Sequence, residues 1–471
     1  MPNFARIRVG DTWIGLSTLG PYYATDSDDQ IQLEYRDYNL VPDGGLVRFY
    51  AGAGDDEFYG EGAFYYGGPG NDTFYNGGTD DFDRQFLGYQ GPAIAHGGLG
   101  NDRFFDSYGD TNYYGGPGSD YFTTVGAFAG VSQAQEGDVD RVWLGSGDDL
   151  AHVAATWWST ADGYIYIPRR VIVDGGQGFD TLIMERSPNW YLGDASIGTH
   201  LNMRDAATGL TYANGTMLVS GFEQYIVLYS DPTIERVTLG RYDDTFIYNG
   251  NSLNDRDQSI RYFGGAGDDL IIGAEDFSRN VMRGGPGDDV LISRGGNSET
   301  QTDVLLGGTG DDILFSRTHA ITHGNVIMHG GPGRDIFVVG QGYSQSIRIL
   351  DFDPDEDIIM IDHNTHLTGF TGITADQIRE EMAYLQSGEI DVWYFDDPND
   401  YTMTEQNGRV LIWGPDYLGA GEAPTVLKYA YSSNSGALYI ARDQSDPYGT
   451  PELLVVLDGA PDLTADHFVI L

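Results

Sequence analysis

The residues best placed to do chemistry in this sequence are aspartates that recur in one glycine-rich frame. The frame is Gly-Gly-x-Gly-x-Asp-x-U-x, in which U is a large apolar residue, and complete copies begin at Gly67, Gly97, Gly115, Gly175, Gly264, Gly284, Gly307 and Gly330. Three weakened copies begin at Ala51, Leu144 and Leu239. One such nonapeptide would be an ordinary turn, whereas this many copies indicate a repeat protein.

Each position of the frame suits a cation site. Glycine allows a positive φ, so a tight turn can aim its carbonyl oxygens at one point, and the aspartate adds an anionic oxygen. Calcium accepts about six to eight oxygen ligands in flexible geometry, so one turn is half a site and a stacked turn supplies the other half. We therefore predict several bound calcium ions, with these sixth-position ligands: Asp56, Asp72, Asp102, Asp120, Asp149, Asp180, Asp244, Asp269, Asp289, Asp312 and Asp335.

A short strand is expected after each aspartate, because the U residue alternates with polar neighbours. The inward-facing U residues are Phe58, Phe74, Phe104, Phe122, Ala151, Leu182, Phe246, Ile271, Leu291, Leu314 and Phe337. Only Ala151 is small, and it lies in a weakened copy.

This repeat resembles that of the RTX (repeats-in-toxin) family over about residues 51–340. The resemblance implies a right-handed parallel β-roll that holds calcium between stacked turns. We expect an all-β fold, a right-handed parallel β-helix or β-roll with glycine-rich calcium-binding turns, plus a small C-terminal β-rich cap region with one helix. The acidic, cysteine-free and lysine-poor composition also resembles, in a general way, that of RTX-bearing bacterial surface-layer proteins.

The spacing of the copies departs from the family's tandem arrays, in which nonapeptides follow one another directly. Here successive copies begin 16, 30, 18, 29, 31, 64, 25, 20, 23 and 23 residues apart. This predicts one nonapeptide and one longer return segment per coil, with calcium mainly along one edge. We expect the array over residues 51–350, with oversized coils and a protruding loop in an insertion at about 184–238.

The two ends of the chain are predicted to be caps. Residues 1–50 include FARIRVGDTWIGLS, which alternates like a strand and could cap the first coil or pair with another subunit. Residues 351–471 resemble the C-terminal cap and type I secretion region of RTX proteins, and ADQIREEMAYLQSG within them predicts a helix. The resemblance implies that Asp351, Asp353 and Asp357 complete the last calcium site. A solvated acidic turn is the alternative.

The charge balance excludes several classes of partner. The chain has 71 acidic and 25 basic residues, a formal charge of −46, and Lys428 as its single lysine. We therefore expect no nucleic-acid binding and no membrane insertion. Cysteine is absent, and neither a cleaved signal peptide nor an apolar spanning segment is visible. Export is expected to use a type I machinery.

A search for catalytic motifs finds none, so we expect no enzyme. His319, His323 and His329 are spaced as in a zinc-protease helix, but Ala320 stands where the general-base glutamate is needed. Carboxylate pairs are too frequent in so acidic a chain to single out a glycosidase pair. The adjacent Trp157 and Trp158 fall in a predicted protruding loop, where at least one is expected to be a contact residue.

These features favour a secreted calcium-binding structural protein of the bacterial cell surface, a surface-layer, matrix or filament subunit that folds and assembles on binding calcium. Its expected partners are further copies of the chain or a cell-surface glycan, and the type I secretion machinery during export. One alternative is a secreted adhesin or glycan-binding module on the same scaffold. Another is a polysaccharide-modifying β-helix enzyme.

Overall fold

The fold is described from a computed structural model of residues 1–471. The described residues are 5–9, 12–16, 20–35, 47–60, 63–76, 93–106, 110–124, 139–154, 157–160, 163–166, 170–185, 199–202, 209–212, 215–228, 234–249, 258–274, 278–294, 302–316, 325–340, 346–362, 402–405, 410–414, 426–432, 435–440, 452–463 and 467–470. The chain forms two compact units, residues 1–229 and 230–471. The array expected over residues 51–350 is thus divided between them.

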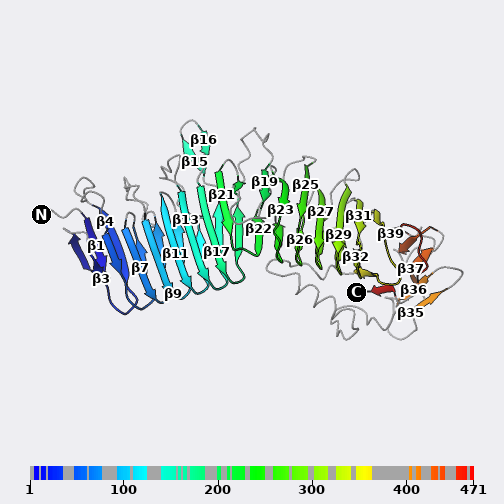
Figure 1. Ribbon diagram of the computed structural model, residues 1–471, viewed down its shortest axis with the longest axis horizontal. Coiled ribbons are helices and arrows are strands. Elements are labelled where there is room, and N and C mark those ends of the chain that lie inside the picture. The colour runs from blue at the N-terminus through cyan, green and yellow to red at the C-terminus, as the bar shows by residue number, and fades with distance from the viewer. Residues whose placement is uncertain are drawn as a thin grey trace. The chain divides into compact units, whose positions relative to one another are not determined.

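The first unit contains two parallel sheets whose strands alternate along the chain (Figure 1). Strands that precede the turns form one sheet: β3 (Tyr22–Tyr23), β5 (Val47–Tyr50), β7 (Ala63–Pro69), β9 (Ala93–Leu99), β11 (Thr111–Pro117), β13 (Val139–Ser146), β17 (Arg170–Gln177) and β21 (Gly215–Ser220). Strands that follow them form the other: β4 (Gln30–Tyr35), β6 (Glu57–Tyr59), β8 (Thr73–Asn76), β10 (Arg103–Asp106), β12 (Tyr121–Thr123), β14 (Leu150–Ala154), β18 (Thr181–Glu185) and β22 (Gln224–Leu228). Because strands of successive nonapeptides are neighbours, the prediction of one nonapeptide per coil is confirmed.

Three further pieces extend the first unit. Strands β1 (Ala5–Val9) and β2 (Thr12–Leu16) form an antiparallel hairpin, and β1 also pairs antiparallel with β4. Strands β15 (Trp157–Thr160) and β16 (Gly163–Tyr166) form a separate hairpin that projects beyond the strands beside it (Figure 1). Within the predicted insertion lie β19 (Thr199–Asn202) and β20 (Gly209–Tyr212), and the latter pairs antiparallel with β21.

The second unit has the same arrangement of two parallel sheets whose strands alternate along the chain. One parallel sheet contains β23 (Ile234–Thr238), β25 (Gln258–Phe263), β27 (Ser278–Pro286), β29 (Thr302–Thr309), β31 (Asn325–His329), β33 (Ser346–Ile349) and β39 (Glu452–Leu457). The other contains β24 (Thr245–Asn249), β26 (Leu270–Ile272), β28 (Val290–Ser293), β30 (Ile313–Ser316), β32 (Ile336–Gly340), β34 (Ile358–Asp362) and β40 (Phe468–Ile470). Beyond β39 the first of these sheets continues antiparallel through β38 (Ala437–Ile440), β37 (Val426–Ser432), β36 (Val410–Gly414) and β35 (Thr402–Glu405).

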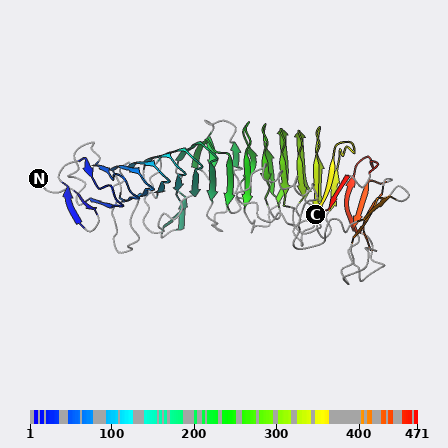
Figure 2. The same ribbon diagram turned by 90° about the horizontal axis from the view of Figure 1, so that it is seen from below.

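Figure 2 shows the parallel strands of the second unit side by side. The described residues contain no α-helix, which agrees with the expected all-β class. The helix expected in ADQIREEMAYLQSG lies outside the described residues. Among the described segments, none is a helix long and apolar enough to cross a membrane.

The core of each unit is a column of U residues. All eleven predicted U residues are buried, each with 2% exposure or less, and they are Cα partners of one another from coil to coil within each unit. In the first unit Phe58 stacks on Phe74 and Phe74 on Phe104, with ring centroids 4.7 and 5.0 Å apart. The inward orientation predicted for these residues is therefore confirmed.

The long interval between the copies at Gly175 and Leu239 contains a coil without the repeat. Strands β21 and β22 lie parallel to β17 and β18, so they form one more coil of the first unit. The described part of the predicted insertion at about 184–238 thus includes this repeat-free coil, and the protruding loop expected there stays a prediction.

The aromatic column provides a test of the core. Replacing fully buried Phe104 by alanine is expected to lower the free energy of unfolding of the calcium-saturated protein by about 3–5 kcal/mol, because it leaves a cavity beside the rings of Phe74 and Tyr113. Its neighbour Phe105 faces outward and stacks on Tyr75 at 4.9 Å, so Phe105→Ala should lower it by only about 1 kcal/mol. Equal losses in denaturant titrations would contradict this account of the core.

Candidate calcium sites

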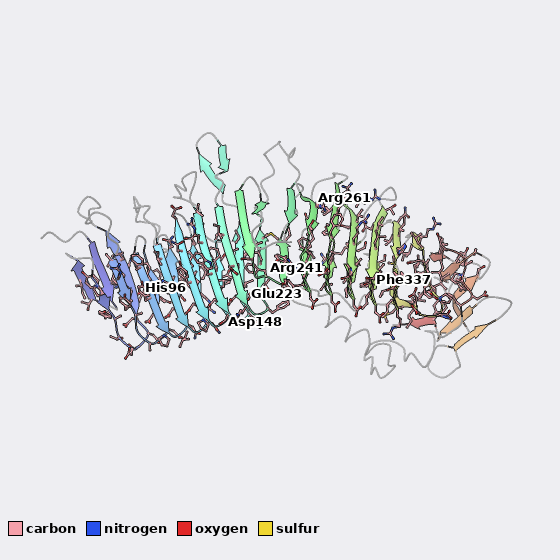
Figure 3. The ribbon with its side chains drawn as sticks, in the orientation of Figure 1. His96, Asp148, Glu223, Arg241, Arg261 and Phe337 are labelled. Atoms are coloured by element: carbon pink, nitrogen blue, oxygen red, sulfur yellow. The ribbon has the colours of Figure 1, made fainter. Side chains whose placement is uncertain are left out.

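The sixth-position aspartates lie in one column per unit at the ends of the glycine turns. The first column contains Asp56, Asp72, Asp102, Asp120, Asp149 and Asp180, and the second contains Asp244, Asp269, Asp289, Asp312 and Asp335. All are buried, although aspartate is rarely buried without a partner. Figure 3 shows the side chains along both units.

One oxygen of each carboxylate holds two coils together. Within each column the backbone N–H of a sixth-position aspartate donates to Oδ1 of the aspartate in the following coil, at 2.6 to 2.9 Å, except that the amide of Asp180 donates to Glu223. The first column begins one coil earlier, where the amide of Asp29 donates to Asp56, and the second ends where the amide of Asp335 donates to Asp357. These bonds explain the aspartate at this position without any metal.

The hydrogen bonds to Oδ1 do not involve the second carboxylate oxygen, Oδ2. Within the described part of the chain, Oδ2 is buried and accepts no hydrogen bond in Asp56, Asp72, Asp102, Asp120, Asp149, Asp180, Asp269, Asp312 and Asp335. A buried anionic oxygen without a partner is strongly destabilising. A cation beside these oxygens would remove that penalty.

Carbonyl oxygens converge on the same places. An added Cβ on Gly264 would overlap both Oδ2 of Asp269 and the carbonyl oxygen of Gly284 in the next coil. Gly67 is surrounded in the same way by Asp72 and the carbonyl of Gly97. Two acceptor oxygens, one of them anionic, thus meet over the first glycine of a turn, which is the kind of donor set that calcium binds.

The titration behaviour of these carboxyl groups reflects their burial. Desolvation is the largest effect, and it raises the pKa to about 8 for Asp102, Asp269 and Asp312, about 7 for Asp72, Asp149 and Asp335, and about 6 for Asp56, Asp120 and Asp180. In Asp102, Asp269 and Asp312 the neighbouring carboxylates of the column raise the pKa further, while the backbone hydrogen bond lowers it. Calcium binding at neutral pH would therefore displace protons.

Three turns without the full glycine pattern use Oδ2 differently. In each of them Oδ2 accepts a hydrogen bond from the backbone amide four residues earlier in the same turn, at 2.7 Å. The pairs are Thr25 with Asp29, Gly240 with Asp244, and Asp353 with Asp357. In the glycine turns the second-position amide donates instead to the next coil, as Gly265 does to Gly284 at 3.0 Å. In Asp244 and Asp357, Oδ2 is therefore already used as a hydrogen-bond acceptor, which makes these two carboxylates weaker candidate ligands than the other predicted aspartates.

The remaining predicted ligands lie in the acidic turn that follows the array. Asp351 accepts from the amides of Gly330 and Gly331 at 3.0 and 2.8 Å and contacts Nδ1 of His329 at 2.8 Å. Asp353 accepts from the amide of Asp355 at 2.9 Å. Both carboxylates therefore have structural roles in closing the last coil.

In most turns the residue before the aspartate belongs to a second ladder that the sequence analysis missed. Here the side-chain oxygen accepts from the amide of the following coil, at 2.7 to 3.0 Å, which is opposite in direction to the first ladder. The accepting residues are Asp28, Asp55, Asn71, Asn101, Asp148, Asp243, Asp268, Asp288 and Asp311. The frequency of Asp and Asn at the fifth position was the available signal.

Glu223 was also missed. The register of β17 with β21 and of β18 with β22 leaves residues 221–223 opposite the turn at residues 175–180. The turn is shorter, and the longer glutamate side chain reaches the amide of Asp180 at 2.8 Å. Glu223 therefore takes the place of a sixth-position aspartate without any repeat signature.

A family model for the RTX calcium-binding nonapeptide repeat matches four copies in this chain, over residues 44–63, 263–298 and 300–317. The chain carries RTX repeats. The matched segments include the turns of Asp56, Asp269, Asp289 and Asp312. A search of curated proteins found no match.

RTX repeats imply bound calcium, and the donor set of the glycine turns fits it. The residues that would hold the ions are the aspartates with an open Oδ2, together with backbone carbonyls of adjacent turns. Bound calcium would supply positive charge between carboxylates that otherwise repel one another. Among the described residues no group of three or more acidic or histidine side chains forms a metal cluster. The carbonyl oxygens beside Oδ2, such as those of Gly97 and Gly284, would complete the sites.

The raised pKa values predict how the calcium-free protein responds to pH. A carboxyl group with a folded-state pKa above its unfolded value of 3.8 stabilises the fold fully below that value, and the contribution is lost as pH rises through the folded pKa. In chelator the native β-structure should therefore persist near pH 5 and be lost near pH 8. Circular dichroism between these values tests this. A native spectrum at pH 8 in chelator would contradict it.

Neighbouring residues separate the ligand role from the ladder role. Asp312→Asn keeps an Oδ1 that can accept from Asp289 but removes the charge at Oδ2, so calorimetry should find fewer bound ions. At calcium about one hundred times the site's Kd, stability should fall by about 2.7 kcal/mol. The control Asp311→Asn keeps the fifth-position acceptor and should bind as many ions as the parent. A loss of ions in both variants, or in neither, would contradict the assignment of Asp312.

Proposed function

We propose that this chain is a secreted structural protein of the bacterial cell surface, a surface-layer, matrix or filament subunit that folds and assembles on binding calcium. The observation that supports this most directly is the pair of buried carboxylate columns with open Oδ2 atoms. Most of the described chain consists of this scaffold, and its stability depends on a cation that is scarce inside cells. RTX repeat proteins are typically exported by type I secretion, and we infer that route here.

The exposed aromatic rings support a structural role. On the outer face of the sheet that contains β3, β5, β7, β9, β11 and β13, the rings of Tyr23, Tyr50, Tyr66, His96, Tyr114 and Trp143 stack successively, with centroids 4.5 to 5.2 Å apart. In the four rings between Tyr23 and Trp143, both faces that could stack on a sugar are covered by neighbouring rings. These side chains therefore stabilise the sheet, and we propose no enzyme activity for them.

One surface favours the glycan-binding alternative. Asp55, Asn71 and Asn101 of the fifth-position ladder line an open polar recess with Glu57, Thr73 and Arg103. Beside it, Tyr59 stacks on Tyr75 at 4.7 Å, and a Tyr59 hydroxyl donates to Glu57 at 2.8 Å. Amide, carboxylate and guanidinium groups near aromatic rings are suited to a polar saccharide. Glycan binding is therefore our second candidate function.

The N-terminal hairpin suggests one assembly contact. Strand β2 pairs with β1 in the described structure, and Ile14 in the middle of β2 is 49% exposed. A strand with an exposed apolar side chain at the end of a sheet is a template for pairing with another chain. We infer that this hairpin contributes to contacts between subunits.

Calcium is expected to convert the intact protein from monomers into large assemblies, visible by electron microscopy. Deleting residues 1–18 removes the hairpin but keeps β3 and β4, so the calcium-bound β-spectrum should persist while extended assemblies are lost. Intact protein that stays monomeric in calcium and binds a glycan array would favour the adhesin. Normal assembly by the truncated chain would exclude the hairpin contact alone.

A further inference from the structure

One face of the second unit has an unexpected charge. On the outer side of β23, β25, β27, β29, β31 and β33, the exposed residues include Arg236, Arg261, Arg279, Arg283 and Arg348. No described side chain that points outward from these six strands is acidic, although the chain has 71 acidic and only 25 basic residues. We call this surface the basic face; Figure 3 labels Arg261 on it.

The register of the strands gathers these arginines. Arg236 and Arg261 are Cα partners, and Phe263 and Arg283 are Cα partners two residues further on. The guanidinium carbon of Arg236 lies 4.3 Å from the centroid of the Phe263 ring, and that of Arg283 lies 5.9 Å from it. Such cation–π contacts hold flexible side chains in place through the ring face. Nε of Arg236 also donates to Oγ1 of Thr238 at 3.2 Å, which leaves the terminal N–H groups of this guanidinium for a partner.

The charges on this face are largely uncompensated. Arg348 forms a two-contact pair with Asp458, at 2.7 and 2.8 Å. Arg279 donates to the carbonyl of Thr302 at 3.0 Å. Among the described carboxylates, none forms an ion pair with Arg236, Arg261, Arg279 or Arg283.

The middle of the basic face is aliphatic. Val281, Val304 and Ile327 are Cα partners on β27, β29 and β31, and all three are partly exposed. Arginines around an apolar centre are typical of protein interfaces, whose cores are depleted of acidic residues. The face therefore fits a partner with carboxylates around an apolar or neutral surface.

The same chain carries a surface of the required charge. In the second unit the fifth-position ladder contains Asp243, Asp268, Asp288 and Asp311, whose Oδ1 atoms accept backbone amides. A guanidinium already contacts the other oxygen of this ladder, since Arg334 lies 3.4 Å from Oδ2 of Asp311. Both surfaces follow parallel strands about 4.8 Å apart, so their charges repeat with the same period.

We propose that the basic face of one copy docks on the fifth-position carboxylate ladder of a second copy. This inference rests on the proposed function, because it names one contact of the calcium-induced assembly. The two surfaces are different, so the contact is heterologous and can propagate from copy to copy. At physiological salt the Debye length is about 8 Å, so the net charge of −46 is screened at a distance while the contact pairs persist.

The first arm of the test neutralises the basic face. Arg236→Gln, Arg261→Gln and Arg283→Gln in one protein should raise the concentration required for calcium-induced assembly, measured by sedimentation, about tenfold or more. A control with Arg48→Gln, Arg141→Gln and Arg170→Gln makes the same change of net charge in the first unit and should assemble like the parent protein. Unchanged calcium titrations by circular dichroism would show that both variants fold.

The second arm neutralises the ladder. In Asp243→Asn, Asp268→Asn and Asp288→Asn each side chain keeps its acceptor oxygen, as Asn71 and Asn101 do in the first unit. This variant should lose assembly to the same extent. Each variant retains one intact half of the contact, so a mixture of the two should form one-to-one complexes that neither forms alone.

The outcomes separate the two hypotheses. Intact protein that stays monomeric in calcium overturns the proposed function and this contact with it. Intact protein that assembles, together with arginine and aspartate variants that assemble equally well, overturns the contact alone. If the arginine variant assembles normally but loses binding to polygalacturonate that the parent protein shows, the basic face serves an anionic glycan and the contact is overturned.

Discussion

The fold depends on placing a column of carboxylates next to one another in the interior. Each sixth-position aspartate contributes one oxygen to a hydrogen bond between coils, and in the glycine turns the second oxygen is left among carbonyls. Without a positive charge this arrangement opposes the fold, because buried like charges repel and have lost their hydration. With calcium the same arrangement would favour the fold. The aspartates would then make stability depend on calcium and on pH, while the apolar U column sets the shape of each coil.

The two ladders have complementary roles. Fifth-position side chains accept from the following coil, and sixth-position side chains accept from the preceding one. Every turn is therefore tied to both of its neighbours through side chains as well as through the sheets. Where the glycine pattern is lost, as at Asp244 and Asp357, the carboxylate folds back on its own turn. Such turns are suited to the ends of a column, because they satisfy the aspartate without a cation.

Much of the fold was predictable from the sequence because each copy of the repeat specifies the same local structure. The glycines, the aspartate and the U residue recur at constant offsets, so the turn, the buried column and the single nonapeptide per coil all follow from the sequence. Glu223 was not predictable, since its turn differs in length and its role appears only when β18 and β22 are seen in register. The fifth-position ladder was overlooked because Asp and Asn in a turn are also expected in solvated loops. The basic face was hidden because its arginines are distant in the sequence and only the register of parallel strands brings them together.

The return segments differ greatly in length while the strands they join remain in register. From β8 to β9 the chain runs from Asn76 to Ala93, whereas from β10 to β11 it runs only from Asp106 to Thr111. Yet β8 lies parallel to β10 and β9 to β11 with matched residues. The strands and the glycine turns make most of the described hydrogen bonds between coils, and Asp110 in the short link adds one more by accepting from the amide of Val139 at 2.6 Å. Because neighbouring parallel strands are about 4.8 Å apart whatever the length of the chain between them, lengthening one link would leave the spacing of the coils that follow it unchanged.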